Sequence, residues 1–410
     1  MKKISTFVLL FVVACTTFAQ TLKVHTGQVT VAVPADKADK MRYEGGTSLT
    51  IYGKTYDIAA IDSITVDRST VPDSTVSVVY GGNTAHVLVS GDIYPNLTVT
   101  AEGADVSVIA DARLLSEVTY RLSGASAAGS FMMDGEFKAT LVLDGLTLTN
   151  PAGPAIDIEN GKRINVRLTD GTTTTLEDGA GGLHKACFFI NGHPEFSGSG
   201  NLVLTGNSRH AYASDEYTYL RSDFSGNIEV KKAVSDGLHV EQYFRMRGGK
   251  VKVSGTGGDC IDVSVTKDPL DVLNGQVFVE GGAIEMTVAA DDVKGLKSDS
   301  LMTISGGSIT ALVSGLGTKG ISVGTNLLIN RASGNATSVN MNVTGTTYKP
   351  GDALLESKCR GIRVKGDFTF DGGDIRISAT GVKSKAVKVD GVYTYKSGSI
   401  NCVVEDMNSI

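Results

Sequence analysis

Residues 361–385 read GIRVKGDFTFDGGDIRISATGVKSK, and residues 386–404 repeat the same pattern as AVKVDGVYTYKSGSINCVV. In the first stretch a glycine pair, Gly372-Gly373, begins eleven residues after Gly361. In the second, Ser397-Gly398 stands at the same offset from Ala386. A fixed period of this length is typical of proteins built from stacked repeats.

The period extends upstream to about residue 233. Successive small residues that open a Gly-Ile-x-Val type strand are spaced by 23, 35, 25, 41 and 25 residues. The basic unit is therefore 23 to 25 residues long, with two expansions, one of them within Val265 to Asn274. These opening residues are Gly237, Cys260, Gly295, Gly320, Gly361 and Ala386.

Within each unit the apolar residues alternate in three short runs, such as Ile362 and Val364, Phe368 and Phe370, then Ile375 and Ile377. Alternation with a period of two is the pattern of a strand with one buried face. Glycine pairs supply the positive φ angles that a tight corner needs. The pattern predicts an all-β fold: a right-handed parallel β-helix with three strands per coil. A propeller would need four antiparallel strands per blade and a longer unit.

The composition agrees with many short strands, because the chain has 49 glycines, 8 prolines and no tryptophan. Residues 20–74 differ from the rest and show hairpin-like alternation. We predict a small N-terminal β element with its join there, followed by a β-helix domain over residues 75–410. The N-terminal element would cap the open end of the β-helix, whose unpaired strands would otherwise invite aggregation.

The first nineteen residues predict export. Lys2 and Lys3 precede an apolar stretch, and small residues stand before Gln20 as in a signal peptidase site. The mature chain is expected to be secreted, periplasmic or at the cell surface. A lipid anchor at Cys15 is the alternative reading. No later apolar run is long enough to span a membrane.

Charge and cysteine content exclude further classes. The formal net charge is −6, which argues against a nucleic-acid partner, whose binding domain would be basic. The cysteines beyond the leader have no zinc-site spacing, and we expect them to be small buried residues, although an oxidising compartment permits disulfides. They are Cys187, Cys260, Cys359 and Cys402.

Residues from about 137 to 410 resemble a bacterial carbohydrate-binding family with a pectate-lyase-like β-helix. The resemblance rests on a small set of segments, the most specific of which lies within residues 141–175. They are Leu141-Val142-Leu143-Asp144-Gly145-Leu146-Thr147-Leu148-Thr149-Asn150, Gly153-Pro154-Ala155-Ile156, Leu168-Thr169-Asp170-Gly171-Thr172, Gly200-Asn201-Leu202-Val203-Leu204-Thr205-Gly206-Asn207, and Gly295-Leu296-Lys297-Ser298-Asp299 ahead of Ile304-Ser305-Gly306-Gly307.

This resemblance implies binding of plant-type or other acidic polysaccharides, helped by calcium and without catalysis. The family pattern tends to place Asp before the small residue that opens each coil, as Asp236 and Asp259 do here. Later coils carry a basic residue at that position, so the resemblance supports calcium only at the first two coils.

Two rows of outward side chains follow from the alternation of strand residues. Because neighbouring coils lie about 4.8 Å apart, residues at equivalent positions should form ladders facing solvent. The first row reads Asp236, Asp259, Lys294, Lys319, Arg360 and Lys385, and the second reads His239, Asp262, Lys297, Ser322, Arg363 and Lys388.

The basic part of these rows would hold carboxylates or sulfates of an anionic glycan. The acidic end, with Asp236, Asp259 and Asp262, offers oxygen ligands to one calcium ion. The alternative is a solvated face whose charges only keep a long sheet from aggregating.

Loops that border this face are further candidates, because binding residues concentrate on loops over rigid scaffolds. One expansion lies at Thr266 to Asp271, and another, Thr346 to Asp352, carries Tyr348 as a candidate ligand-binding residue. A third expected loop, Ser208 to Ser225, carries Tyr212, Tyr217 and Tyr219.

The function that these patterns favour is non-catalytic binding of an extended, acidic polysaccharide, and no catalytic residue is predicted. One alternative is a calcium-assisted polysaccharide lyase, because Lys294 and Lys297 follow the carboxylates by one coil. Another is a structural or adhesin β-helix with no glycan ligand.

Overall fold

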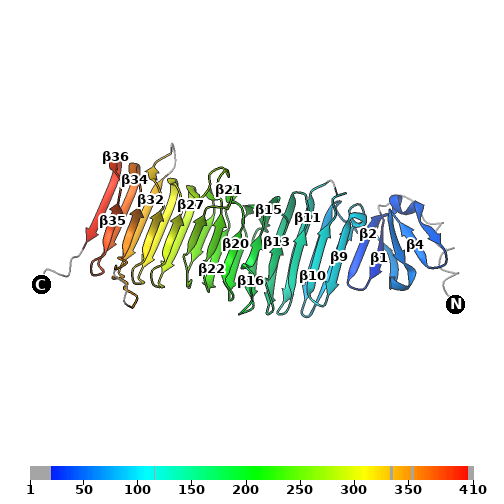
Figure 1. Ribbon diagram of the computed structural model, residues 1–410. Coiled ribbons are helices and arrows are strands. Elements are labelled where there is room, and N and C mark those ends of the chain that lie inside the picture. The colour runs from blue at the N-terminus through cyan, green and yellow to red at the C-terminus, as the bar shows by residue number, and fades with distance from the viewer. Residues whose placement is uncertain (1–19, 115, 333–335, 352–354, 405–410) are drawn as a thin grey trace.

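A computed structural model describes residues 20–404, except 115, 333–335 and 352–354. These residues form an elongated stack of strands that run across its long axis, with the two ends of the chain at opposite ends of the stack (Figure 1). The fold is all-β and most strand pairs are parallel, as predicted. The predicted leader, including Cys15, lies outside the described residues.

One sheet, which we call the narrow sheet, receives one strand from each coil. Its strands pair in parallel from β10 onward, and each pairs with the equivalent strand of the next coil. The strands are β9 (Leu97–Glu102), β10 (Asp105–Ala110), β12 (Ser130–Asp134), β14 (Ile156–Ile158), β17 (Ala186–Ile190), β20 (His210–Ser214), β23 (Leu238–Glu241), β26 (Ile261–Ser264), β28 (Lys294–Ser298), β30 (Lys319–Val323), β33 (Arg360–Val364) and β35 (Lys385–Val389).

A second, larger sheet, the broad sheet, holds the remaining strands of the coils. They are β1 (Thr21–Thr26), β2 (Val29–Pro34), β6 (Ser63–Asp67), β7 (Thr75–Gly81), β8 (Thr84–Ser90), β11 (Val118–Ser126), β13 (Ala139–Asn150), β15 (Arg163–Leu168), β16 (Thr173–Asp178), β18 (His193–Gly198), β19 (Asn201–Gly206), β21 (Thr218–Phe224), β22 (Asn227–Ala233), β24 (Tyr243–Met246), β25 (Lys250–Val253), β27 (Gln276–Val288), β29 (Met302–Val313), β31 (Leu327–Asn330), β32 (Thr337–Val343), β34 (Phe368–Ala379) and β36 (Tyr393–Val404).

The glycine pairs mark a corner within the broad sheet. In β34 the second and third predicted strands form one continuous strand that bends at Gly372 and Gly373, whose φ angles are +118° and +100°. The register with β36 shifts at the same point. Glycine is needed here because a side chain would make these positive φ angles costly.

The interior is a set of apolar columns. Leu238, Ile261 and Leu296 are in register on successive strands and fully buried, and Ile321 and Ile362 continue the column. Because apolar residues occupy equivalent positions in successive coils, their side chains contact one another and are kept away from water.

The cysteine prediction is confirmed in part. Cys187, Cys260 and Cys359 are buried as expected, whereas Cys402 is exposed on β36, the last described strand of the stack. All four carry free thiols.

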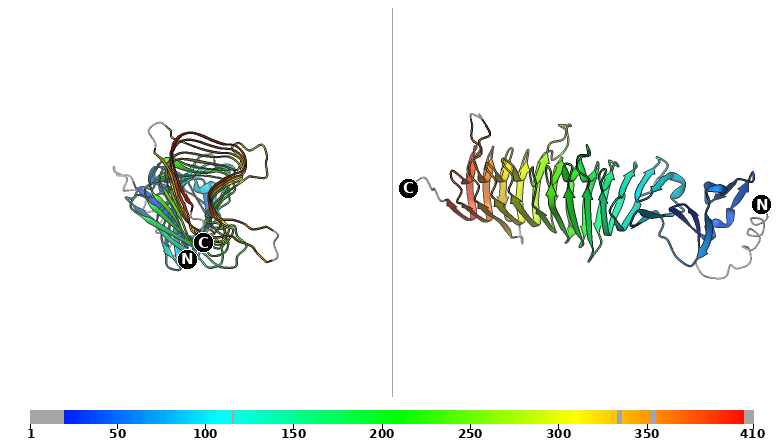
Figure 2. Two further views of the ribbon diagram at one scale, coloured as in Figure 1. Left: turned by 90° about the vertical axis from the view of Figure 1, so that its left-hand side faces the viewer. Right: turned by 90° about the horizontal axis from the view of Figure 1, so that it is seen from below.

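The N-terminal residues pair differently from the coils. Strand β1 pairs antiparallel with both β2 and β6, and β2 joins the stack through a parallel pairing with β8. In Figure 2 this part lies at one end of the stack. The other elements here are β3 (Arg42–Glu44), β4 (Ser48–Ile51) and β5 (Lys54–Asp57), with the short helices η2 (Ala35–Lys40) and η3 (Ile58–Ala60); η4 (Tyr94–Asn96) precedes β9. The domain boundary near residue 74 stays a prediction.

The predicted loops have two outcomes. No strand lies between Ser264 and Gln276, and none lies in the described residues between Val343 and Arg360, so both expansions are confirmed. The prediction of a loop from Ser208 to Ser225 is wrong, because the strands β20 and β21 both lie within this range. Within the described part of the chain, no helix is long and apolar enough to cross a membrane.

The corner glycines yield a stability prediction. Gly249 has a φ of +71°, and a Cβ there would overlap the Phe224 ring. Gly249→Ala should therefore lower the free energy of unfolding by about 1–3 kcal/mol in urea. The control is Gly161→Ala, since a Cβ at Gly161 meets nothing within 4 Å. Equal stability of the two variants would contradict the corner role.

Candidate functional site

The two predicted rows lie on the narrow sheet in the predicted register. In the second row, His239 pairs with Asp262 and Asp262 with Lys297. The row continues in register through Ser322, Arg363 and Lys388. In the first row, Lys294 pairs with Lys319, Lys319 with Arg360, and Arg360 with Lys385. Side chains far apart in the sequence therefore follow one another coil by coil.

The prediction that both rows face solvent is wrong at three positions, because Asp259, Asp262 and Arg360 are buried. The Arg360 guanidinium turns back to its own strand and donates to the carbonyl of Cys359 at 2.6 Å. Neighbouring side chains of opposite charge cover the two aspartates. The alternation of residues along a strand fixes the side of the sheet on which a side chain lies. Its exposure to solvent also depends on the long side chains next to it.

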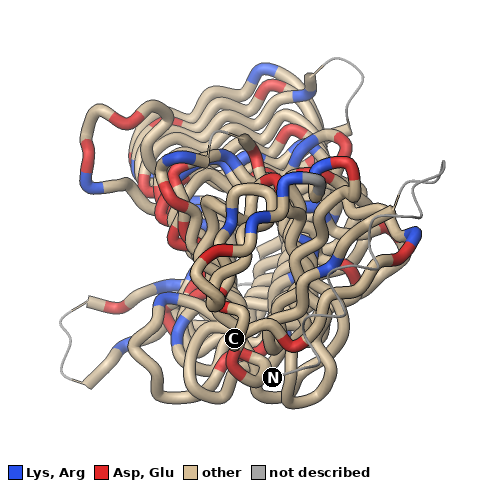
Figure 3. The backbone as a smooth tube through the Cα atoms, turned by 90° about the vertical axis from the view of Figure 1, so that its right-hand side faces the viewer, with Lys and Arg blue, Asp and Glu red and all other residues tan. Residues whose placement is uncertain are grey.

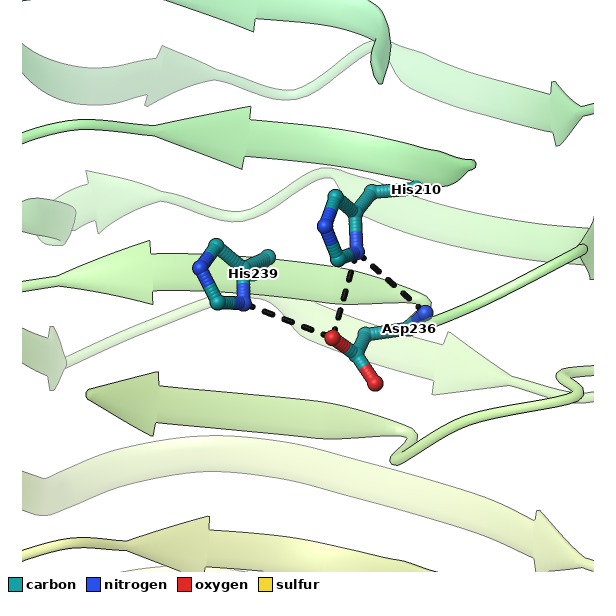
Figure 4. Close-up of side chains that lie close together, drawn as sticks. All are labelled: His210, Asp236 and His239. Carbon is teal, nitrogen blue, oxygen red and sulfur yellow. Dashed lines mark hydrogen bonds and ion pairs between the residues drawn. The ribbon is translucent and has the colours of Figure 1, made fainter. Parts of the chain in front are cut away.

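The acidic end of the rows is a network of histidines and carboxylates (Figure 4). Asp236 Oδ2 lies 3.1 Å from His210 Nδ1 and 3.3 Å from His239 Nδ1. His239 Nδ1 also lies 3.0 Å from Asp262 Oδ2. The other oxygen of Asp262 accepts a hydrogen bond from Lys297 Nζ at 2.7 Å.

These contacts shift the pKa values of the network. Burial alone would raise the pKa of Asp236, but the contacts of its carboxylate with His210 and His239 outweigh burial and hold the pKa well below its usual range. Burial alone would lower the pKa of His239, yet Asp236 and Asp262 raise it to about 9. Burial raises the pKa of Asp259 to about 6 although Lys294 opposes this shift. Such shifts are common where groups take part in chemistry or binding, and also in structural ion networks.

The middle lysines are held by the protein itself. Lys319 Nζ contacts Asp292 at 3.1 Å and Ser357 at 2.6 Å. Ser357 belongs to the second expansion and pairs with Tyr348 through an isolated antiparallel bridge, so this expansion lies against the first row. Lys294 Nζ donates to the carbonyl of Asp292 and is 4.0 Å from Asp259.

Positive charge is least compensated in the last two coils. Arg363 and Lys388 share one carboxylate, Asp390. Lys385 is exposed and has no side-chain partner among the residues that the structure describes. Viewed along the stack, acidic and basic positions are otherwise mixed around the coils (Figure 3).

Sequence reasoning missed the upstream continuation of the second row. Asp157 pairs with Phe189, and Phe189 with Ala213, which pairs with His239. A groove of about 340 Å³ opens here, lined by Asp157, Phe189 and the residues Pro154, Glu159, Leu183, His184, Lys185, Ala186, Asn191 and Asp215. The signal was present, because Ala155-Ile156-Asp157-Ile158 has the same alternation as the later rows.

Burial, with the nearby Glu159, raises the pKa of Asp157 to about 6. On the rim of the same groove, Lys185 pairs with Asp215, and His184 Nε2 lies 2.7 Å from the buried Asp178. The groove thus places a carboxyl of raised pKa among a lysine, a histidine and an exposed apolar side chain, Leu183.

A ladder of rings on the broad sheet was also missed. Tyr217 stacks on His193 with centroids 4.8 Å apart and on Tyr243 at 4.7 Å. Because each of these ring faces covers another, the ladder presents mainly edges, and stacking of sugars on its inner faces is blocked. Tyr212, expected on a loop, is instead buried in the core.

The carboxylates predicted to hold calcium do not form an oxygen cage. Asp236 and Asp262 each lie against histidine nitrogens, and Lys297 contacts Asp262. Asp259 Oδ1 accepts the backbone N–H of Lys294 at 2.7 Å. Calcium prefers six to eight oxygen ligands. These carboxylates, which lie against histidine nitrogens and a lysine, therefore do not fit calcium.

Comparisons with known proteins agree with this architecture. The sequence profile of a family described as carbohydrate-binding domain-containing protein matches residues 96–405. A carbohydrate-binding domain-containing protein of Acetivibrio thermocellus is 26% identical over 151 residues, which are 34% of this chain and 52% of that protein. This chain therefore spans about half the length of the curated relative that it matches.

A solved structure is also similar: the gadolinium derivative of the polysaccharide lyase-like protein from C. thermocellum. The TM-score is 0.51 at 23% sequence identity, over 65% of this chain and 99% of that chain. At this identity the likeness shows a shared, lyase-like fold.

The groove carboxyl yields a pH-dependent prediction. Because folding raises the Asp157 pKa from 3.8 to about 6, its ionisation costs stability above pH 6 and nothing below pH 3.8. Asp157→Asn should therefore raise the free energy of unfolding at pH 8 by about 1–3 kcal/mol and leave it nearly unchanged at pH 3.5. Denaturant unfolding at both pH values checks this.

The control is Asp134→Asn, which removes an exposed carboxylate from β12 and should change stability little at either pH. A loss of stability in Asp157→Asn at pH 8 would show that the carboxylate is stabilising, contrary to this account.

Proposed function

Because this chain belongs to the family of carbohydrate-binding domain-containing proteins, we propose that it binds an extended acidic polysaccharide along the narrow sheet without cleaving it. The ligand would run parallel to the long axis of the stack and contact several coils at once. The groove at Asp157 and the basic coils at Arg363 and Lys388 would then belong to one continuous surface.

The observation that carries this proposal is the register of the second row. From Asp157 through His239 to Lys388, each coil sets one residue of the narrow sheet above the previous one, with the apolar Phe189 and Ala213 between Asp157 and His239. Strands are spaced by about 4.8 Å, so the polar groups from His239 onward repeat at a distance comparable with that between neighbouring sugar units. A linear polymer matches such a surface better than a compact ligand does.

The last two coils supply the charge preference. Arg363, Lys385 and Lys388 have one carboxylate among them, Asp390. An arginine binds a carboxylate through two parallel hydrogen bonds, which favours uronic acids over neutral sugars. Arg360 is buried and its guanidinium already has an acceptor, so we assign it a structural role beneath this surface.

Several finer features belong to the proposal. The stack would be a right-handed parallel β-helix with three strands per coil, since crossovers between parallel strands are nearly always right-handed. A protein that binds polysaccharide would be exported, as the leader sequence indicates. Tyr348, on the expansion next to Lys319, would border the bound chain.

A calcium-assisted lyase is the second candidate function, and one observation favours it. Asp259 has a pKa of about 6, and its Oδ1 lies 4.0 Å from Lys294 Nζ. An acid and a base with such neighbours suit proton abstraction beside a carboxylate. Both groups are held by other protein contacts, however, and the donor set does not fit calcium. We therefore favour binding.

Removing the basic side chains of the last two coils should weaken glycan binding. The triple variant Arg363→Ala, Lys385→Ala, Lys388→Ala should lose about tenfold or more in affinity for polygalacturonate at low salt. Each contact between a basic side chain and a ligand carboxylate contributes modestly at an exposed site, and the variant removes three of them. The difference should shrink as salt rises. Affinity electrophoresis or calorimetry measures both.

The matched control removes three lysines from the broad sheet: Lys250→Ala, Lys252→Ala, Lys396→Ala. It carries the same change in net charge and should keep most of the affinity. Equal losses in both variants would indicate a non-specific charge effect, and no binding by the wild type would favour a structural role without a glycan.

Catalysis is tested separately. The wild-type protein incubated with polygalacturonate and calcium should produce no steady rise in the ultraviolet absorbance of unsaturated products. A rise that Lys294→Ala abolishes would establish the lyase function and overturn this proposal.

A further inference from the structure

The histidine–carboxylate network on the narrow sheet brings together four potential metal ligands. His210 opens β20, Asp236 lies just before β23, and His239 lies within β23. Their ligand atoms all lie within 4.8 Å of one another. Asp262, on the next strand, adds an oxygen 3.0 Å from His239 Nδ1.

Two buried nitrogen atoms of this network have no hydrogen-bond partner among the described residues: His210 Nε2 and His239 Nδ1. His210 Nδ1 lies 3.3 Å from the backbone nitrogen of Asp236 and 3.1 Å from Asp236 Oδ2 (Figure 4).

His239 shows the same problem. Its Nδ1 is buried and lies close to two carboxylate oxygens, yet it makes no well-directed hydrogen bond to either. Buried polar atoms are normally satisfied. His239 Nδ1 lacks a partner although it lies between the carboxylate oxygens of Asp236 and Asp262, an arrangement that a bound cation would satisfy.

The separations suit a metal ion. Ligand atoms bound at about 2.0–2.1 Å in a tetrahedron are roughly 3.3 Å apart. The three histidine–carboxylate distances, 3.1, 3.3 and 3.0 Å, are close to that edge length. Only small side-chain rotations would bring the two nitrogens and the carboxylate oxygens onto one ion.

We propose that His210, Asp236, His239 and Asp262 form a binding site for a divalent transition-metal ion of the zinc class. Imidazole nitrogens together with carboxylate oxygens suit zinc and its neighbours, whereas calcium takes oxygen ligands alone. The two carboxylate ligands are supported from behind: Asp236 Oδ1 accepts the backbone N–H of Asp259, and Asp262 Oδ1 accepts a hydrogen bond from Lys297 Nζ. Such outer contacts hold ligands in place.

The ion would be reachable from solvent. The His239 side chain is 22% exposed and that of Asp236 14%, while His210 closes the inner side. The site therefore combines a buried ligand with an open approach from the outer face of the narrow sheet. This inference does not depend on the proposed glycan binding, and its test uses the metal alone.

The test is equilibrium dialysis of the tag-free, chelator-treated protein against Zn²⁺, Co²⁺ and Ca²⁺, with metal quantified per chain. We expect one Zn²⁺ or Co²⁺ bound per chain, a visible absorption band from bound Co²⁺, and no comparable Ca²⁺ binding. His239→Gln and Asp262→Asn should each weaken Zn²⁺ binding by about tenfold or more. Both residues lie on the outer face of the sheet, and thermal unfolding verifies that each variant is folded.

The matched control is His193→Gln, which removes a partly exposed histidine from the broad sheet next to a carboxylate, Glu216. It should leave Zn²⁺ binding unchanged. The proposal is overturned by any of three results: no stoichiometric Zn²⁺ or Co²⁺ in the wild type, full binding in folded His239→Gln, or Ca²⁺ bound in preference to Zn²⁺.

Discussion

Parallel hydrogen bonding between equivalent strands of successive coils is the constraint on which the rest of this structure depends. It sets every residue of one coil above its counterpart in the next, as Ile261 lies above Leu238 and Leu296 above Ile261. Inside the stack this produces continuous apolar columns that bury their surface without any long helix or compact core. Outside, the same rule turns residues separated by a full repeat into neighbours, which is how a row of functional groups arises.

This rule explains how much could be predicted from the sequence. The period, the strand positions, the glycine corners and the order of both rows depend only on spacing, and the pairings of Lys294, Lys319, Arg360 and Lys385 follow it. Exposure does not depend on spacing alone. Arg360 is buried because its side chain folds back to Cys359. His210 was missed because its coil, with a tyrosine at an inward position, looked like a loop.

The same geometry shapes the electrostatics of the narrow sheet. Like charges on consecutive coils would repel each other at the spacing of strands. Side chains of opposite charge offset this repulsion, as Asp262 does between His239 and Lys297. Compensation is incomplete at two places: the groove around Asp157, where burial favours the neutral acid, and the last coils, where basic groups exceed acidic ones. A ligand that reaches both must be long, and its preference for charge would come from the basic end.

Affinity for a series of oligogalacturonides of increasing length tests this account most directly. If a chain lies along the row, each added unit reaches another coil, so calorimetry should show affinity rising over several units and then levelling off. A monosaccharide or disaccharide that binds as tightly as the long oligomers would contradict the account, because it would place recognition in a single pocket and leave the register of the rows without a role in binding.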